Sequence, residues 1–108
     1  MNHEERTTED FVATKHAIKR LRQRMGLPKR AVMRVLKKAF AEGHDSSEYK
    51  GMFGLFLDKI KANAGPATKV LVHQDFLYII YQSEGRRDRI LTAYHIPPEF
   101  RAMTRRMK

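Results

Sequence analysis

Three side chains spaced four residues apart, His16, Arg20 and Arg24, are of types that act together on a phosphate group. On an α-helix, where successive residues turn by roughly 100°, this spacing places them in one row. Histidine can give or take a proton near neutral pH, and arginine can hold a phosphate with two hydrogen bonds. The row therefore predicts proton transfer beside a bound anion. The alternative is a structural histidine next to arginines that pair with acids such as Asp58 or Glu48.

The row lies on a predicted helix that Thr14 caps and Gly26 ends. Between these two residues, Ile18, Leu21 and Met25 recur at i, i+3 and i+7. That is the spacing of the apolar stripe by which an amphipathic helix packs on a core. The His16 row is thereby predicted to lie beside the buried stripe.

A second helix is predicted to start near Pro28, which suits a first helical turn, and to stop at Gly43. Its apolar positions recur at helical spacing: Val32, Val35, Leu36, Ala39 and Phe40. Residues 14–43 carry ten Lys or Arg against one acid, Glu42, and so supply +9 of the net +10. Such a concentration of charge favours a polyanion as partner. The side chains predicted to bind nucleic acid are Lys15, Lys19, Arg30, Arg34, Lys37 and Lys38.

The remaining sequence predicts one more short element and then strands. Residues 52–61 match a helical template, with a strand as the alternative because the run is short and contains a glycine. The runs 70–73, 76–82 and 90–95 are rich in Val, Ile, Leu and Tyr and are typical of an antiparallel meander. Simple alternation in the last run puts one set of side chains on one face, Ile90, Thr92 and Tyr94, and the other set on the opposite face, Leu91, Ala93 and His95.

These elements predict an α+β fold in which two N-terminal basic amphipathic helices pack on a C-terminal antiparallel β-sheet of three or four strands. Residues 1–12 are predicted to be a flexible acidic arm, residues 13–97 a single α+β domain, and residues 98–108 a basic C-terminal tail.

The composition narrows the class of protein. A chain of 108 residues can bury a core without help from a metal or a disulfide, and it contains no cysteine. The acidic N-terminus does not resemble a signal peptide, and no run approaches the ~18 apolar residues of a membrane span. We therefore expect a soluble cytoplasmic protein, a monomer or a homodimer, with no membrane partner.

Three segments, TKHAIKRLRQRMGLPKRAVMRVLKKAFAEG, VLVHQDFLYIIYQ and ILTAYHIP, resemble small proteins of bacteriophages and prophages. Those proteins share a pattern of the form T-K-H-A-x-x-R-x-x-x-R, then G-L-P-K, then a terminal strand like L-I-T-V-Y-x-L-P. The resemblance covers roughly Thr14 to Pro97. More distantly, the order of elements is similar to the superfamily of barnase, EndoU, colicin and RelE type ribonucleases, whose members place N-terminal helices against an antiparallel sheet.

The ribonuclease resemblance implies metal-independent RNA cleavage with His16, Arg20, Arg24 and Thr92 as the catalytic positions. In such cleavage the 2′-hydroxyl is the nucleophile, so the protein supplies a base, an acid and cations, and no cofactor. Thr92 would hydrogen-bond the phosphate or orient the histidine; an ordinary strand residue is the alternative. Candidates for a second proton-transfer group are His73 and His95. Candidates for base stacking are Tyr78, Tyr81 and Tyr94, with packing inside the sheet as their alternative.

Two functions from different classes are therefore expected. The first is a phage-type protein that binds nucleic acid, RNA in preference to DNA, and that cleaves RNA if the predicted constellation assembles. The second is a non-catalytic inhibitor of a host defence ribonucleoprotein, like an anti-CRISPR, that acts through its basic helical face. Weaker alternatives are a helix-turn-helix DNA reader and a metal site built from His44, Asp45 and Glu48, whose spacing matches no specific site.

Overall fold

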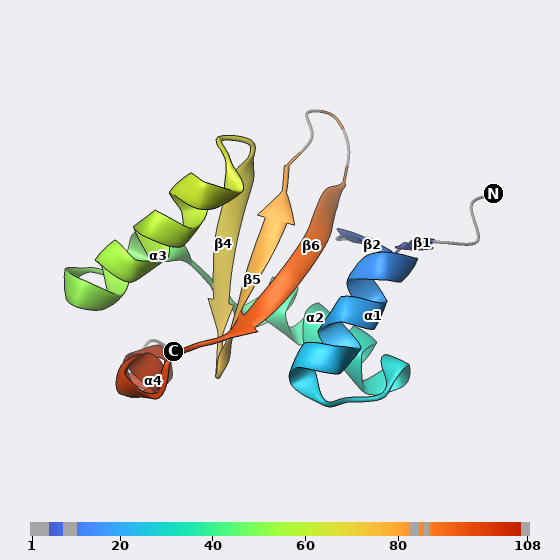
Figure 1. Ribbon diagram of the computed structural model, residues 1–108, viewed down its shortest axis with the longest axis horizontal. Helices are drawn as coiled ribbons and strands as arrows, with labels where there is room; N and C mark the ends of the chain where they lie inside the picture. The colour runs from blue at the N-terminus through green and yellow to red at the C-terminus, as the bar shows by residue number, and fades with distance from the viewer. Residues whose placement is uncertain (1–4, 8–10, 83–84, 86, 107–108) are drawn as a thin grey trace.

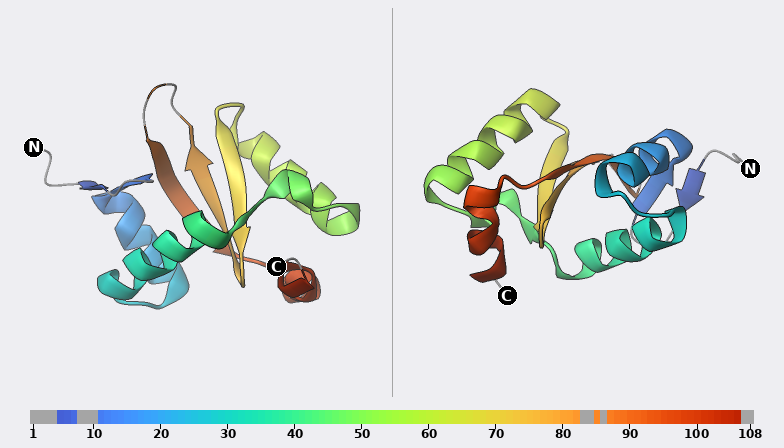
Figure 2. Two further views of the ribbon diagram at one scale, coloured as in Figure 1. Left: turned by 180° about the vertical axis from the view of Figure 1, so that it is seen from behind. Right: turned by 60° about the horizontal axis from the view of Figure 1, so that its bottom comes forward.

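The computed structural model describes residues 5–7, 11–82, 85 and 87–106 and has three layers, with a mixed β-sheet between two layers of helices (Figures 1 and 2). Its strands are β1 (Glu5–Thr7), β2 (Phe11–Thr14), β3 (His44–Asp45), β4 (Thr68–His73), β5 (Phe76–Tyr81) and β6 (Asp88–His95). Its helices are α1 (Lys15–Met25), α2 (Lys29–Glu42), α3 (Gly51–Ala64), α4 (Arg101–Arg106) and two short 3-10 helices, η1 (Ser46–Glu48) and η2 (Pro98–Phe100).

The sheet has the strand order β1-β2-β6-β5-β4-β3. The predicted antiparallel meander is confirmed as β4, β5 and β6. The prediction of three or four antiparallel strands is nevertheless incomplete, because β2 pairs in parallel with β6 and two further short strands, β1 and β3, extend the edges. Strands of two to four residues are too short to show an alternating pattern, so the sequence gives no signal for them.

Both predicted N-terminal helices are confirmed. Thr14 caps α1, since its hydroxyl oxygen accepts a hydrogen bond from the Ala17 N–H at 3.1 Å. Gly26 ends α1 in the left-handed conformation, with φ of 66°. Pro28 is the N-cap residue of α2, one position before the first turn for which it was predicted. The helical prediction for residues 52–61 is also confirmed, and α3 extends beyond it at both ends.

The two faces of the sheet bury separate apolar clusters. On one face, α1 and α2 pack their apolar stripes against the sheet; the fully buried members include Leu21, Val32, Leu36 and Tyr78. On the other face, α3 packs Phe53 and Leu57 against β4 and β5. Figure 2 shows α1 and α2 on one side of the sheet and α3 on the other.

The packed structure extends beyond the predicted domain ends. Within the predicted arm, Glu5–Thr7 and the first half of β2 are strand, and the Phe11 ring is fully buried and stacked on Phe40 with 4.6 Å between centroids. The rest of the arm lies outside the described residues. At the other end, Phe100 stacks on Phe53 with 5.0 Å between centroids, so this residue of the predicted tail also packs against the core.

A register shift between Ile79 and Ile80 changes the faces of β6. Ile80 pairs with Ile90, whereas Ile79 pairs with Thr92, so Leu91 is the extra residue of a bulge. Directly opposite residues share a face. The predicted alternation is therefore wrong before the bulge: Ile90 shares a face with Ala93 and His95, whereas Leu91 shares one with Thr92 and Tyr94.

Candidate nucleic-acid interface

The outer sides of α1 and α2 carry ten exposed cations, which we call the basic face: Lys15, Lys19, Arg20, Arg22, Arg24, Lys29, Arg30, Arg34, Lys37 and Lys38. Each helix buries its apolar stripe against the sheet, so its charged residues point outward. None of the ten forms an ion pair with an acid in the part of the chain that the structure describes. The predicted pairing of Arg20 or Arg24 with Asp58 or Glu48 is thus not formed. The ten charges remain available to a partner.

His16 lies exposed in the first turn of α1, one turn before Arg20, and makes no hydrogen bond within the described residues. Thr92 lies elsewhere. Its register opposite Ile79 places it on the α3 face of the sheet, whereas α1 covers the opposite face. The Thr92 side chain is also buried, and its hydroxyl has no hydrogen-bond partner among the described residues. The structure therefore keeps His16 and Arg20 together but separates Thr92 from them.

The third residue of the predicted row, Arg24, reaches the end of β6. Its guanidinium carbon lies 4.2 Å from the centroid of the Tyr94 ring, within the range of a cation–π contact. His95 Nε2 donates a hydrogen bond to the Arg24 backbone carbonyl at 2.7 Å. That carbonyl is in the last turn of α1, where the helix itself supplies no donor. The His95 ring also packs on Phe76, with 4.6 Å between centroids.

These contacts are possible because one edge of β6 is open. Strand β2 pairs only with Asp88–Ile90, so no described strand pairs with β6 beyond Ile90 on that side. The Arg24 side chain passes this edge and meets Tyr94, whose own side chain belongs to the α3 face. The basic face is in this way connected to the other side of the sheet.

The other predicted aromatic and histidine candidates differ in access. Tyr78 is fully buried on the α1–α2 face, and burial raises the pKa of its hydroxyl above the ordinary value. Tyr81 and Tyr94 are 40% and 39% exposed, so these two can present a ring surface to a ligand. His73 lies 3.5 Å from the Glu42 carboxylate, apart from the Arg24 contacts. Only His95 of the two histidine candidates contacts the predicted row.

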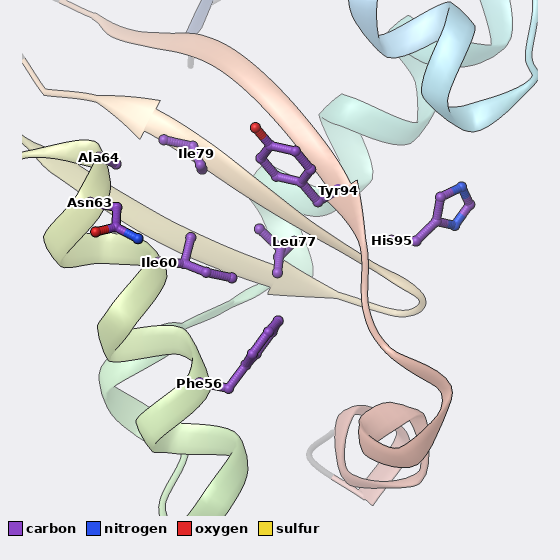
Figure 3. Close-up of a pocket in the computed structure, with 8 residues that line it drawn as sticks. All are labelled: Phe56, Ile60, Asn63, Ala64, Leu77, Ile79, Tyr94 and His95. Atoms are coloured by element: carbon purple, nitrogen blue, oxygen red, sulfur yellow. The ribbon is translucent and has the colours of Figure 1, made fainter.

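An open hollow of about 430 Å³ lies between α3 and the end of β6 (Figure 3). We call it the β6 hollow. Its lining is mostly apolar: Phe56, Ile60, Asn63 and Ala64 from α3, Leu77 and Ile79 from β5, and Tyr94 and His95 from β6. In Figure 3 the His95 imidazole points away from the hollow, toward α1. None of the α3 residues that line the hollow was predicted as a site residue, because the helical spacing of Phe56 and Ile60 indicates a buried face and carries no sign of a hollow.

The weaker alternatives are also placed by the structure. Asp45 and Glu48 form a capping box at η1, in which Asp45 accepts from Ser47 and Glu48 accepts from the Asp45 N–H. His44 Nδ1 lies 3.1 Å from the other Glu48 oxygen. These side chains thus hold a turn together, and no group of three metal-ligating side chains occurs among the described residues. A helix-turn-helix core is absent from the described chain, because α3 lies across the sheet from α1 and α2.

In comparisons with protein-family models, curated proteins and solved structures, none matches this chain. Among the described residues, no helix is long and apolar enough to cross a membrane.

Proposed function

We propose that this protein binds single-stranded RNA and that the basic face provides the contacts to the phosphates. The observation that carries the proposal is the set of ten exposed cations on α1 and α2, with no acid partner among the described residues. Arginine and lysine side chains on one surface neutralise successive phosphates and release counterions, which supplies most of the affinity of such complexes. The exposed Tyr94 ring beside Arg24 adds an aromatic surface of the kind on which unpaired bases stack.

Binding without cleavage is the form of this function that the geometry supports best. Cleavage through the predicted constellation needs His16, the arginines and Thr92 around one phosphate, and Thr92 belongs to the opposite face of the sheet. The proposed function is accordingly RNA binding without cleavage.

The test compares two sets of three cations at equal net charge. One variant carries Arg30→Gln, Arg34→Gln and Lys37→Gln on the basic face. Its matched control carries Lys50→Gln, Lys59→Gln and Lys61→Gln, which are exposed at or on α3. Binding of a labelled 20-nucleotide RNA is followed by fluorescence anisotropy at several salt concentrations.

We expect the basic-face variant to bind roughly 30-fold more weakly and its logarithmic salt dependence to flatten by about 2, since three phosphate contacts are lost. The control should stay within about 3-fold of the wild type, because its charges lie outside the interface. Equal weakening by both variants would contradict the proposal. Failure of the wild type to bind RNA at low salt would favour an acidic protein surface as the partner of the basic face.

The same RNA also tests for cleavage. Wild type and His16→Ala are incubated with RNA in excess EDTA, and the fragment ends are analysed. We expect intact RNA in both samples. Fragments with 2′,3′-cyclic phosphate ends from the wild type alone would replace the binding proposal with a ribonuclease that uses His16.

A further inference from the structure

The β6 hollow combines a size and a lining that suit a neutral, flat group. Its volume is about 430 Å³, its walls include the rings of Phe56 and Tyr94, and its floor is aliphatic. No Lys, Arg, Asp or Glu is among the described residues that line it, so its lining has no permanent charge to attract a phosphate or a metal ion. Its amide side chain, Asn63, supplies both hydrogen-bond donors and an acceptor.

The hollow is connected to the basic face at Arg24, which contacts two of the lining residues, Tyr94 and His95. Tyr94 lines the hollow, and the Arg24 guanidinium lies 4.2 Å from the centroid of the same ring. Arg24 belongs to the row that begins at His16 and Arg20 on α1. A strand of nucleic acid whose phosphates lie along α1 therefore arrives beside Tyr94.

The arrangement of charged and apolar side chains at this place is complementary to a nucleotide. A cation stands at the rim, where a phosphate would lie, and a ring, apolar side chains and one amide lie beyond it, where a base would lie. Proteins hold unpaired bases by stacking them on aromatic rings and reading their edges with polar groups. A base paired in a duplex cannot enter such a hollow, because it is stacked and bonded to its complement.

We propose that the β6 hollow receives one unpaired base of the bound RNA, which stacks on Tyr94 and presents its edge to Asn63. The inference rests on the proposed function and adds to it: single strands are preferred over duplexes, and part of the affinity depends on a base as well as on phosphates.

The experiment separates bases from phosphates. Two labelled 12-nucleotide RNA strands are compared, one complete and one in which the four central nucleotides lack their bases but keep every phosphate. The quantity measured is the ratio of the two dissociation constants. A Tyr94 variant also removes the ring that Arg24 contacts. Displacement of Arg24 weakens the binding of both strands alike and leaves this ratio unchanged. A change in the ratio therefore reports only on contacts to the base.

For the wild type we expect the complete strand to bind about 10-fold more tightly, the scale of one stacked base. Tyr94→Ala should reduce the ratio to about 1. Its matched control is Tyr81→Ala, a tyrosine of equal exposure that does not line the hollow, and it should keep the wild-type ratio. Asn63→Ala, at an exposed position that tolerates truncation, should give an intermediate ratio.

Equal binding of both strands by the wild type would overturn the inference while the proposed function stands. The hollow would then be a binding site for a side chain of a protein partner. The inference is overturned in the same way if Tyr94→Ala keeps the same ratio of dissociation constants as its control, Tyr81→Ala. If the wild type binds neither strand, the proposed function itself fails, and the inference fails with it.

Discussion

The two sides of the sheet are alike in their apolar packing but differ in their outer surfaces. On both sides, helices bury aromatic and aliphatic side chains against the strands. The outer side of α1 and α2 carries ten cations, whereas α3 exposes Asp58, Lys59 and Lys61 together with the apolar Met52 and Leu55. Because both sides bury an apolar cluster against the sheet, packing does not account for the charge on one of them. The difference indicates that folding does not need the charge of the basic face, and this is the strongest reason to connect that face with a partner.

The largest expected effect tests whether the two cores are equivalent. Phe11→Ala removes a fully buried ring on the α1–α2 side, and Phe53→Ala removes one on the α3 side. Each should lower the free energy of unfolding by about 3–5 kcal/mol, through lost burial and the cavity left behind. Urea unfolding followed by circular dichroism measures both.

The outcome for Phe11 decides how far the domain extends. A loss below about 1 kcal/mol would mean that β2 contributes little to the core. Such a result would support the flexible arm predicted from the sequence.

A smaller effect of opposite sign is expected at two hydroxyls, one on each side of the sheet. Tyr78 on the α1–α2 side and Thr92 on the α3 side are buried, and their hydroxyl oxygens have no hydrogen-bond partner within the described chain. Replacing an unsatisfied buried polar group by an apolar one of similar shape removes a desolvation cost. Tyr78→Phe and Thr92→Val should each raise the free energy of unfolding by about 1 kcal/mol in the same urea assay.

Thr92→Val also examines the role implied by the ribonuclease resemblance. The variant should bind RNA as the wild type does, since Thr92 lies away from the basic face. A stability loss at either position would show that its hydroxyl has a partner in solution, such as water.

The smallest effect concerns the turn that carries the chain from α2 on one side to α3 on the other. Partial burial of the Asp45 carboxylate opposes its ionisation, but hydrogen bonds from Ser47, with the charges of Lys61 and Lys69, outweigh burial and hold its pKa below the ordinary 3.8. A carboxyl whose pKa is lowered by folding stabilises the fold above its unfolded-state pKa. That contribution is lost as the pH falls through the folded-state pKa.

We therefore expect Asp45→Asn to be less stable than the wild type near pH 6 by less than about 1 kcal/mol, the scale of a cap interaction. The gap should close below the ordinary pKa of 3.8. Urea titrations across this pH range measure it, with Asp58→Asn, an exposed carboxylate on α3, as the control. Parallel stability curves for the wild type and Asp45→Asn would contradict the expectation.

Local patterns were sufficient for most of the elements. The stripe of Ile18, Leu21 and Met25 predicted α1, and the Thr14 cap and the Gly26 stop are confirmed at those residues. The runs of β-branched and aromatic residues predicted the meander. The short strands were missed because their own two to four residues carry no period, and because β2 and β3 pair with strands far away in the sequence, β6 and β4.

The predicted site residues show the same division. Neighbours one helical turn apart, such as His16 and Arg20, were grouped correctly because helix geometry alone places them together. Thr92 was grouped with them through a resemblance, and a single bulge residue, Leu91, sets the register that places it on the other face. A one-residue shift in a strand exchanges its two faces, and no local sequence pattern predicts such a shift.

The sequence by itself determined the helices, the meander and the concentration of charge in residues 14–43, because these depend on spacing and composition along the chain. Only the tertiary structure decided that Arg24 meets Tyr94 and His95, and that a hollow lies beside them. Those contacts depend on where β2 stops pairing with β6 and on how α3 sits across the sheet. They follow from the packing of whole elements, in which each position depends on all the others.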